Sequence, residues 1–343
     1  VVLDLLIGDP KGLPHPVQFM GVVINFSKGL TERIAKENKS KLYIGGFIIT
    51  LVVVALSGLS GWLIERLYLF FQINNPIFST LFFAFILSSS LASKSLTKSI
   101  LQILNLISKE NNRDNLINSR KKLSLIVGRD VENLDASEIL RALAETASEN
   151  SVDGIFAPLF WMFLGTIFWE FNQSMPGPLA MAWIFKASST VDSMIGYKVG
   201  KLKWLGFIGA KLDDLMVWIP SRIVLITLPF CCKPKQSIFK IIKDSWKDGI
   251  IDSSPNSGIS EAIFAYCAEV QMGGVNYYKG QKRLKPIIAK TYPKASINSV
   301  RKILGLSLRL ELVWLLGFYL IIKLYDRPWF RIDDPKRKGG YKI

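Results

Sequence analysis

Residues 42–64 contain no charged side chain. A helix rises about 1.5 Å per residue, so a run of this length can cross a hydrocarbon core of about 30 Å. A second uncharged run covers residues 76–93, and the polar residues 72–76 separate the two runs as a turn would. Residues 42–64 and 76–93 are therefore predicted to form a transmembrane hairpin.

Three more apolar segments follow along the chain. Residues 154–188 are broken by Pro176-Gly177-Pro178, which predicts a second apolar hairpin. Residues 215–232 and 303–325 are interrupted by charged side chains and are weaker membrane segments. A buried helix in a soluble core would have the same pattern, so that alternative stays open for both.

The composition supports a membrane protein. Half of the 343 residues are hydrophobic, and the mean hydropathy is +0.29. No internal repeat or low-complexity linker divides the chain. We therefore expect an all-α, polytopic integral membrane protein, in which residues 1–343 form a single membrane-embedded domain and polar cytoplasmic loops carry the site.

The positive charge has a characteristic position. The formal net charge is +16, and basic residues gather beside the apolar runs. Lys39 and Lys41 precede the first hairpin, and Lys94 and Lys98 follow it. This pattern is typical of cytoplasmic loops beside anionic lipid. It predicts a multi-pass protein of the cytoplasmic (cell) membrane whose partner is the lipid bilayer, and it does not indicate nucleic acid.

An acidic segment stands out in this basic chain. Residues 128–153 hold seven carboxylates against two arginines. Asp135 and Glu138 have capping-box spacing for a helix that reaches about Glu149. Arg141, Glu145 and Glu149 would share one face of that helix. A chain of surface ion pairs is the alternative, but Asn150 and Asp153 lead directly into the apolar segment, which places these carboxylates near the membrane surface.

Two further polar segments, residues 190–220 and 253–274, combine acid, glycine and proline. Asp213 and Asp214 are adjacent and follow Asp192. Neighbouring carboxylates repel unless a cation lies beside them, and Mg²⁺ binds carboxylate and phosphate oxygens together. An exposed helix N-terminus, which favours acids, is the alternative.

The turn Ser254-Pro255-Asn256-Ser257-Gly258 precedes a predicted helix that carries Glu261. Backbone N–H groups at such a helix start can bind phosphate, although an ordinary turn would have the same spacing. His15 is the only histidine and lies between two prolines, shortly after Asp9. It cannot supply a histidine-based metal site, and a structural role is its alternative.

These segments together resemble the adenosylcobinamide-phosphate synthase family, the membrane proteins called CbiB or CobD in cobalamin pathways. The matching blocks are Gly8-Asp9-Pro10 with His15-Pro16-Val17, Gly128-Arg129-Asp130, Arg141-Ala142-Leu143-Ala144-Glu145-Thr146, Glu149-Asn150-Ser151-Val152-Asp153-Gly154, Asp192-Ser193-Met194-Ile195-Gly196-Tyr197, Asp213-Asp214 with Arg222, and Ser254-Pro255-Asn256-Ser257-Gly258. They occur in the family's order over residues 3–280. Lys211 stands where the family more usually has arginine, and the chain after about residue 280 matches nothing in the pattern.

The resemblance implies cobalamin biosynthesis. The family's reaction joins adenosylcobyric acid to (R)-1-aminopropan-2-ol or its O-phosphate, with ATP as co-substrate and Mg²⁺ as cofactor. Its product is adenosylcobinamide or its phosphate. The corrinoid and the amine are thus expected partners, and other membrane-associated cobalamin assembly enzymes are candidate neighbours.

Candidate roles follow from this scheme. The catalytic candidates are Glu145, Glu149, Asp153, Asp192, Asp213 and Asp214. Mg²⁺ ligands are expected among Asp192, Asp213, Asp214 and Glu145. The candidates for binding substrate or phosphate are Arg141, Asn150, Lys211, Arg222, Ser254, Asn256, Asp9 and His15. The sequence has no Walker A loop, so ATP is implied by the resemblance alone.

Two other functions stay as alternatives. A Mg²⁺-dependent membrane transferase of the prenyl type would also use Asp-rich motifs, but as spaced pairs such as DxxxD, whereas Asp213 and Asp214 are adjacent. A membrane transporter would favour inverted repeats, and none is visible in the sequence.

Overall fold

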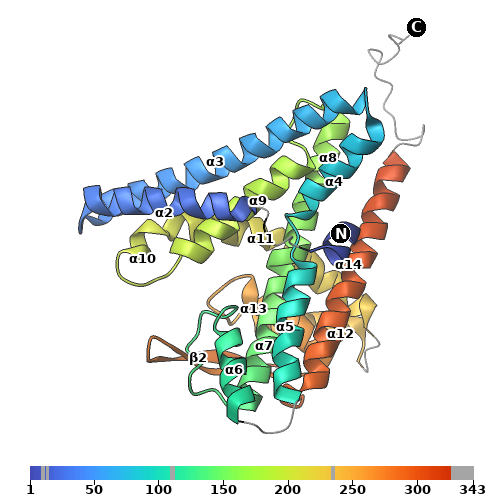
Figure 1. Ribbon diagram of the computed structural model, residues 1–343. Coiled ribbons are helices and arrows are strands. Elements are labelled where there is room, and N and C mark those ends of the chain that lie inside the picture. Colours follow the sequence, from blue (N-terminus) through green and yellow to red (C-terminus); the bar gives the residue numbers. More distant parts are fainter. Residues whose placement is uncertain (9–11, 13–14, 109–112, 233–235, 326–343) are drawn as a thin grey trace.

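A computed structural model describes residues 1–8, 12, 15–108, 113–232 and 236–325 (Figure 1). The elements are α1 (Val2–Leu6), α2 (Pro16–Ala35), α3 (Lys39–Gln72), α4 (Pro76–Ser88), α5 (Ser93–Ser108), α6 (Arg113–Leu123), α7 (Ala136–Ser151), the π-helix η1 (Val152–Phe156), α8 (Ala157–Phe171), α9 (Pro178–Ile195), α10 (Leu202–Leu205), α11 (Phe207–Thr227), the 3-10 helix η2 (Leu228–Cys231), α12 (Ile238–Gly249), α13 (Ser257–Ala268), β1 (Met272–Tyr278), β2 (Gln281–Ile288) and α14 (Ile297–Tyr325).

Membrane-spanning helices are the main feature of the fold. Within the described residues, α3, α7–η1–α8, α11–η2 and α14 are each long and apolar enough to cross a bilayer, and α4 with α5 forms a further candidate bent by 45°. The outward sides of these helices carry exposed apolar side chains, such as Leu59, Phe70 and Leu316, which suit contact with lipid. The predicted class of polytopic helical membrane protein is confirmed.

The first predicted hairpin corresponds to α3 and α4. The Asn38 side chain caps α3 and that of Asn75 caps α4, so the chain turns between residues 73 and 75 as the sequence predicted. Helix α3 is longer than residues 42–64, however, because it continues through Glu65 and Arg66. Its 34 residues span about 51 Å.

Glu65 explains how a charge can be accommodated in α3. Its carboxylate accepts hydrogen bonds from the backbone N–H groups of Gly177 (2.8 Å), Leu179 (2.7 Å) and Ala180 (2.9 Å), at the start of α9. No side chain within α9 caps this end. Glu65 thus supplies, from another helix, the acceptor that the first turn of α9 needs.

The second predicted hairpin is present as α8 and α9, joined by residues 172–177. Its first arm does not start at residue 154, however. Helix α7 continues through η1 into α8, and the joined helix Ala136–Phe171 has 36 residues. The helix predicted from Asp135 to about Glu149 is confirmed, because Asp135 caps α7 and accepts from the Glu138 N–H at 2.8 Å. The helix continues beyond the predicted end, so most of the acidic segment is helix rather than loop.

The all-α prediction missed one element, the antiparallel hairpin of β1 and β2. Lys279 and Gly280 form its turn with φ of +51° and +76°, which is typical of a two-residue turn of type I′. Asp130 holds this turn, since its carboxylate accepts from the N–H groups of Lys279 (2.9 Å) and Gly280 (2.7 Å).

Helix α9 connects two hydrophobic cores. One core joins α2, α3 and α9 through residues such as Ile24, Ile49 and Val191. The other joins α5, α7, η1, α11, α13 and α14 through residues such as Leu143 and Phe264. In Figure 1, α2 and α3 run across the upper part of the molecule, whereas α5, α7 and α14 run lengthwise below. The spanning helices therefore do not all have the same direction.

Replacing Glu65 tests its role in capping α9. Glu65→Ala leaves three backbone N–H groups without their acceptor, and hydrogen bonds to a charged group contribute about 1.5–3 kcal/mol each. We expect a loss of at least about 3 kcal/mol in unfolding free energy, measured by thermal unfolding in detergent. Glu37→Ala is the control, because the Glu37 side chain is 85% exposed and makes one surface ion pair with Lys201. Equal effects of both variants would contradict the capping role.

Candidate functional site

The sequence blocks that are far apart along the chain meet at one place. Three helices supply carboxylates there: Glu145, Glu149 and Asp153 from α7 and η1, Asp192 from α9, and Asp213 and Asp214 from α11. Helix α11 packs against both η1 and α9, which brings the three sets together. We call Glu149, Asp153, Asp192, Asp213 and Asp214 the acidic cluster.

Mutual repulsion is the main electrostatic property of the acidic cluster. The groups acting on Asp153 are the carboxylates of Asp213, Glu149 and Asp192 and the ammonium of Lys186. Asp213 likewise faces Asp192, Asp214 and Glu149, again with Lys186 as the opposing charge. The carboxylates thus outnumber the neighbouring cation, and a bound cation would stabilise this arrangement.

Asp213 has the most exceptional environment in the cluster. Its Oδ1 atom is buried and has no hydrogen-bond partner. A buried carboxylate oxygen without a partner is costly, and a metal ion is one way to satisfy it. Within the described residues, no three His, Cys, Asp or Glu side chains form a ready set of metal ligands. Mg²⁺ often takes only one or two carboxylates and completes its coordination with water and phosphate, so the cluster suits Mg²⁺ in that form.

Asp192 lies at the end of α9, where a glycine makes room for it. Burial, together with the carboxylates of Asp214 and Glu149, raises the pKa of Asp192 from 3.8 to about 6, against the opposing effect of Lys198. A Cβ atom at Gly196 would lie 1.9 Å from Asp192 Oδ1. The carboxylate can therefore occupy this position only because residue 196 has no side chain.

Glu145, a predicted metal ligand, is engaged by protein donors in this structure. Its Oε1 accepts from Arg141 Nη1 at 3.0 Å and from the Gly273 N–H at 2.9 Å, and its Oε2 pairs with Arg129. The side chain is 1% exposed. Both carboxylate oxygens are therefore occupied by protein donors, and Glu145 joins α7 to the β-hairpin.

Arg141, a predicted substrate- or phosphate-binding residue, is likewise engaged by other protein groups. Its guanidinium pairs with Glu138 and Glu145 and donates to the Val275 carbonyl (2.9 Å) and Asn276 Oδ1 (3.0 Å). The predicted face of α7 is correct, because Arg141 and Glu145 do meet at i and i+4. The pair is largely buried, however, and its contacts are structural.

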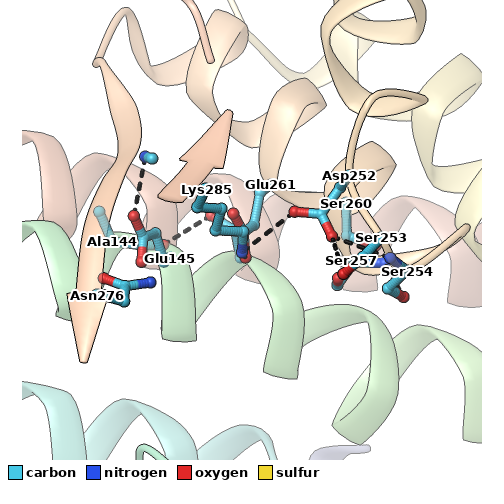
Figure 2. A network of polar contacts seen from close by, with 12 residues as sticks. Ala144, Glu145, Asp252, Ser253, Ser254, Ser257, Ser260, Glu261, Asn276 and Lys285 are labelled. Atoms are coloured by element: carbon cyan, nitrogen blue, oxygen red, sulfur yellow. Dashed lines mark hydrogen bonds and ion pairs between the residues drawn. The ribbon is translucent and has the colours of Figure 1, made fainter. Parts of the chain in front are cut away.

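A second group of charges surrounds Lys285 on β2. Its ammonium pairs with Glu261 on α13 and lies 3.7 Å from Asp252 Oδ2 (Figure 2). Burial lowers the pKa of Lys285, but the carboxylates of Glu261, Glu145 and Glu149 raise it and outweigh burial. Lys285 therefore stays charged. Glu261 Oε2 is buried without a hydrogen-bond partner.

The serine-rich turn before α13 is fixed from two sides. Arg222 on α11 donates to the Asn256 side chain and, at 2.7 Å, to the Pro255 carbonyl. Asn256 Nδ2 donates to the Asp214 carbonyl at 2.7 Å. Arg222 and Asn256 thus hold this turn against the acidic cluster, whereas Ser254 lines a polar cavity beside it.

The other predicted binding residues lie in different places. Asn150 lines the same polar cavity as Ser254. Lys211 is exposed, 3.6 Å from Asp214 Oδ2. His15 caps α2 by accepting from the Val17 N–H at 3.2 Å and lines a separate apolar cavity. Asp9 lies outside the described residues.

Sequence reasoning missed three charged residues. Lys285 lies in the part of the chain that matched no block, and only its contacts identify it. Arg129 was noted in the acidic segment, but its pairing with Glu145 depends on the fold. Lys186 gave the clearest signal, since it is a single charge in the apolar part of α9 and such charges are often functional.

The CobD/Cbib protein family matches residues 1–307. The chain belongs to the CobD/CbiB family. It is 36% identical over 326 residues to the cobalamin biosynthesis protein CobD of Synechocystis sp., a match that covers 94% of this chain and 90% of the relative. It is 35% identical to the cobalamin biosynthesis protein CbiB of Salmonella typhi, over 89% of this chain and 90% of the relative.

A third CobD/CbiB relative is the cobalamin biosynthesis protein CobD of Clostridium perfringens, at 36% identity over 88% of this chain and 89% of the relative. No solved structure gives a significant match. The predicted family is therefore confirmed from sequence, and the structure shows how the family's sequence blocks are arranged in space.

The pairing of Glu145 with two arginines predicts a stability effect. Glu145→Gln keeps the size of the side chain but leaves Arg129 and Arg141 buried without their shared counter-charge. Breaking such a pair costs about 3–5 kcal/mol, which thermal unfolding in detergent would measure. The control is Glu138→Gln, because Glu138 also pairs with Arg141 but its side chain is 42% exposed; it should cost less than about 1 kcal/mol. A fully stable Glu145→Gln would restore a direct role in binding or catalysis.

The raised pKa of Asp192 predicts a pH effect. The folded protein binds this proton more tightly than the unfolded chain, so the resulting stability is present below the unfolded pKa of 3.8 and is lost as pH rises through about 6. The unfolding midpoint without divalent cations should therefore fall over this range, and Mg²⁺ should raise it mainly above pH 6, where Asp192 is ionised. Asp192→Asn should flatten this part of the profile. An Asp192→Asn profile identical to that of the wild type would contradict the assignment.

Proposed function

We propose that the protein acts in cobalamin biosynthesis as an ATP-dependent amide ligase. It would join a carboxylate of adenosylcobyric acid to (R)-1-aminopropan-2-ol or to its O-phosphate. The convergence of the acidic cluster from α7, η1, α9 and α11 is the observation that carries this proposal, because carboxylates hold the Mg²⁺ ion in Mg²⁺-dependent phosphoryl transfer. The names of the relatives support the pathway.

The proposed reaction has two steps. A carboxylate is a poor acyl donor, so its oxygen first attacks the γ-phosphorus of ATP, giving an acyl phosphate and ADP. The amine nitrogen then attacks the acyl carbon and expels inorganic phosphate, which forms the amide. Mg²⁺, when bound, neutralises phosphate charge. Asp213 and Asp214 would hold it, since Asp213 has an oxygen without a partner.

The amine must lose protons before and during its attack. Asp192 can accept one near neutral pH, because its pKa of about 6 is closer to neutrality than that of an ordinary carboxylate. The negative cluster would also attract and orient the ammonium form of the amine. Glu149 and Asp153 contribute to that attraction from the same side.

The proposal also concerns location. ATP and the other substrates are cytoplasmic, so the acidic cluster would open to the cytoplasmic side of the cell membrane. The basic residues beside the first hairpin favour the same orientation.

Turnover by the purified protein tests the ligase assignment directly. The protein in detergent would receive adenosylcobyric acid, ATP, Mg²⁺ and either amine, and both ADP and the corrinoid amide would be measured. Equal amounts of the two products are expected with at least one amine. If neither amine gives any amide, the ligase assignment is wrong.

Two substitutions test the role of the acidic cluster. Asp213→Asn and Asp214→Asn keep side-chain size but remove charge, and each should lower kcat by at least about a hundredfold while the protein stays folded. The control is Glu132→Gln, an exposed carboxylate in the same acidic segment as Glu145, which should keep normal activity. Near-normal rates in both aspartate variants at low Mg²⁺ would show that the cluster is structural.

A further inference from the structure

We propose that a polar cavity beside the acidic cluster binds the phosphate groups of a Mg²⁺-complexed ligand. The cavity has a volume of about 540 Å³ and lies between α7, the turn before α13 and the β-hairpin. Nothing in the sequence blocks assigned a nucleotide site, and this inference rests on the proposed function only for the identity of the ligand.

Three cations line the cavity: Arg129, Arg283 and Lys285. Arg283 and Lys285 lie two residues apart on β2 and therefore point to the same face of the hairpin. Asn276 pairs with Arg283 across the strands, so it shares this face. Arg129 and Lys285 are largely buried, with side chains 8% and 19% exposed. Arg129 also pairs with Glu145 and Lys285 with Glu261, whereas Arg283 has no ion pair within the described residues. A guanidinium of this kind, supported by two further cations, suits phosphate oxygens.

The opposite wall provides hydroxyl and backbone donors. Ser253, Ser254 and Ser257 line the cavity at the start of α13. The side chain of the N-cap residue, Asn256, makes no capping hydrogen bond to this 12-residue helix. Ser254 Oγ accepts from the Ser257 N–H at 3.2 Å, which places the serine hydroxyl at the helix start. A helix start of this kind attracts an anion through its backbone donors and its dipole.

A buried carboxylate provides the independent indication of a ligand. The Asp252 side chain is 8% exposed and lines the cavity. Its Oδ1 atom accepts from the Ser254 N–H at 2.9 Å, whereas its Oδ2 atom has no hydrogen-bond partner and forms only a long ion pair, 3.7 Å from Lys285 Nζ. Glu149 lines the same cavity. Two carboxylates among three cations and three serines disfavour a bare anion but suit phosphate that arrives with Mg²⁺.

The position of the cavity fits phosphoryl transfer. Glu149 belongs both to the cavity wall and to the acidic cluster, so the two sites are adjacent. The phosphate groups could come from ATP or from the phosphorylated amine. Both sources present the same chemistry to Arg283, Lys285 and the serine turn, and binding experiments can separate them.

The test measures binding to the full-length protein in detergent, without turnover. The probes are a non-hydrolysable ATP analogue, inorganic pyrophosphate and (R)-1-aminopropan-2-ol O-phosphate, each with Mg²⁺ at fixed ionic strength.

Two substitutions in the cavity wall are expected to weaken binding. Arg283→Gln should weaken binding of the occupying ligand by about tenfold. Ser257→Asp should weaken it at least as much, and it should leave the helix intact because acids are favourable at a helix N-terminus. Lys282→Gln is the matched control, since Lys282 is exposed on the same strand but does not line the cavity.

Each outcome is decisive. Weaker probe binding in Arg283→Gln and Ser257→Asp, with less than about a twofold change in affinity in Lys282→Gln, supports the site. The probe whose binding is weakened identifies the source of the phosphate. Binding that none of the three substitutions alters, or that all three alter equally, overturns it.

Turnover separates this proposal from the ligase assignment. If ATP supports turnover with an unchanged KM in Arg283→Gln and Ser257→Asp, the proposed phosphate site is wrong and the ligase assignment stands. If a phosphate probe binds through these residues but no turnover is detected, the proposed phosphate site is supported and the ligase assignment is wrong.

Discussion

Repulsion between half-buried carboxylates is the constraint on which this structure depends. Five side chains of one sign meet where η1, α9 and α11 join, and Lys186 opposes the charges of Asp153 and Asp213. Burying that much like charge is costly unless the surroundings are rigid and a cation is available. The interlocked helices provide the rigidity: Gly196 lets Asp192 fit against its own helix end, and Asn256 ties the turn before α13 to the Asp214 carbonyl.

The charged side chains near the β-hairpin have two different kinds of environment. Arg129 and Arg141 neutralise Glu145, and Asp130 holds the hairpin turn. In contrast, oxygens of Asp213, Asp252 and Glu261 are buried and have no hydrogen-bond partner. A protein interior rarely leaves such atoms unsatisfied without a functional reason. The neutralised half therefore stabilises the fold, and the unsatisfied half is where ligands are expected.

Local signals in the sequence predicted local structure well. Asp135 predicted the start of α7, the polar residues 72–76 predicted a turn, and the ordered blocks predicted the family. The sequence did not predict that α7 continues through η1 into α8, because the change from polar to apolar composition near residue 154 resembles the boundary of a segment. The hairpin and Lys285 were missed for another reason: their pairing with α7 and α13 joins positions far apart in the chain, and no short pattern records such contacts.

The π-helix η1 has a consequence for sequence variation. Each residue turns a helix by about 100°, so the wider turn at residues 152–156 sets the direction in which the apolar face of α8 points relative to the acidic face of α7. Deleting one residue there would restore a regular helix of almost the same length. It would also rotate α8 about its axis, so that a different face of α8 would contact α9. Insertions and deletions within this family should therefore be absent from the joined helix Ala136–Phe171 and lie in the connections between helices.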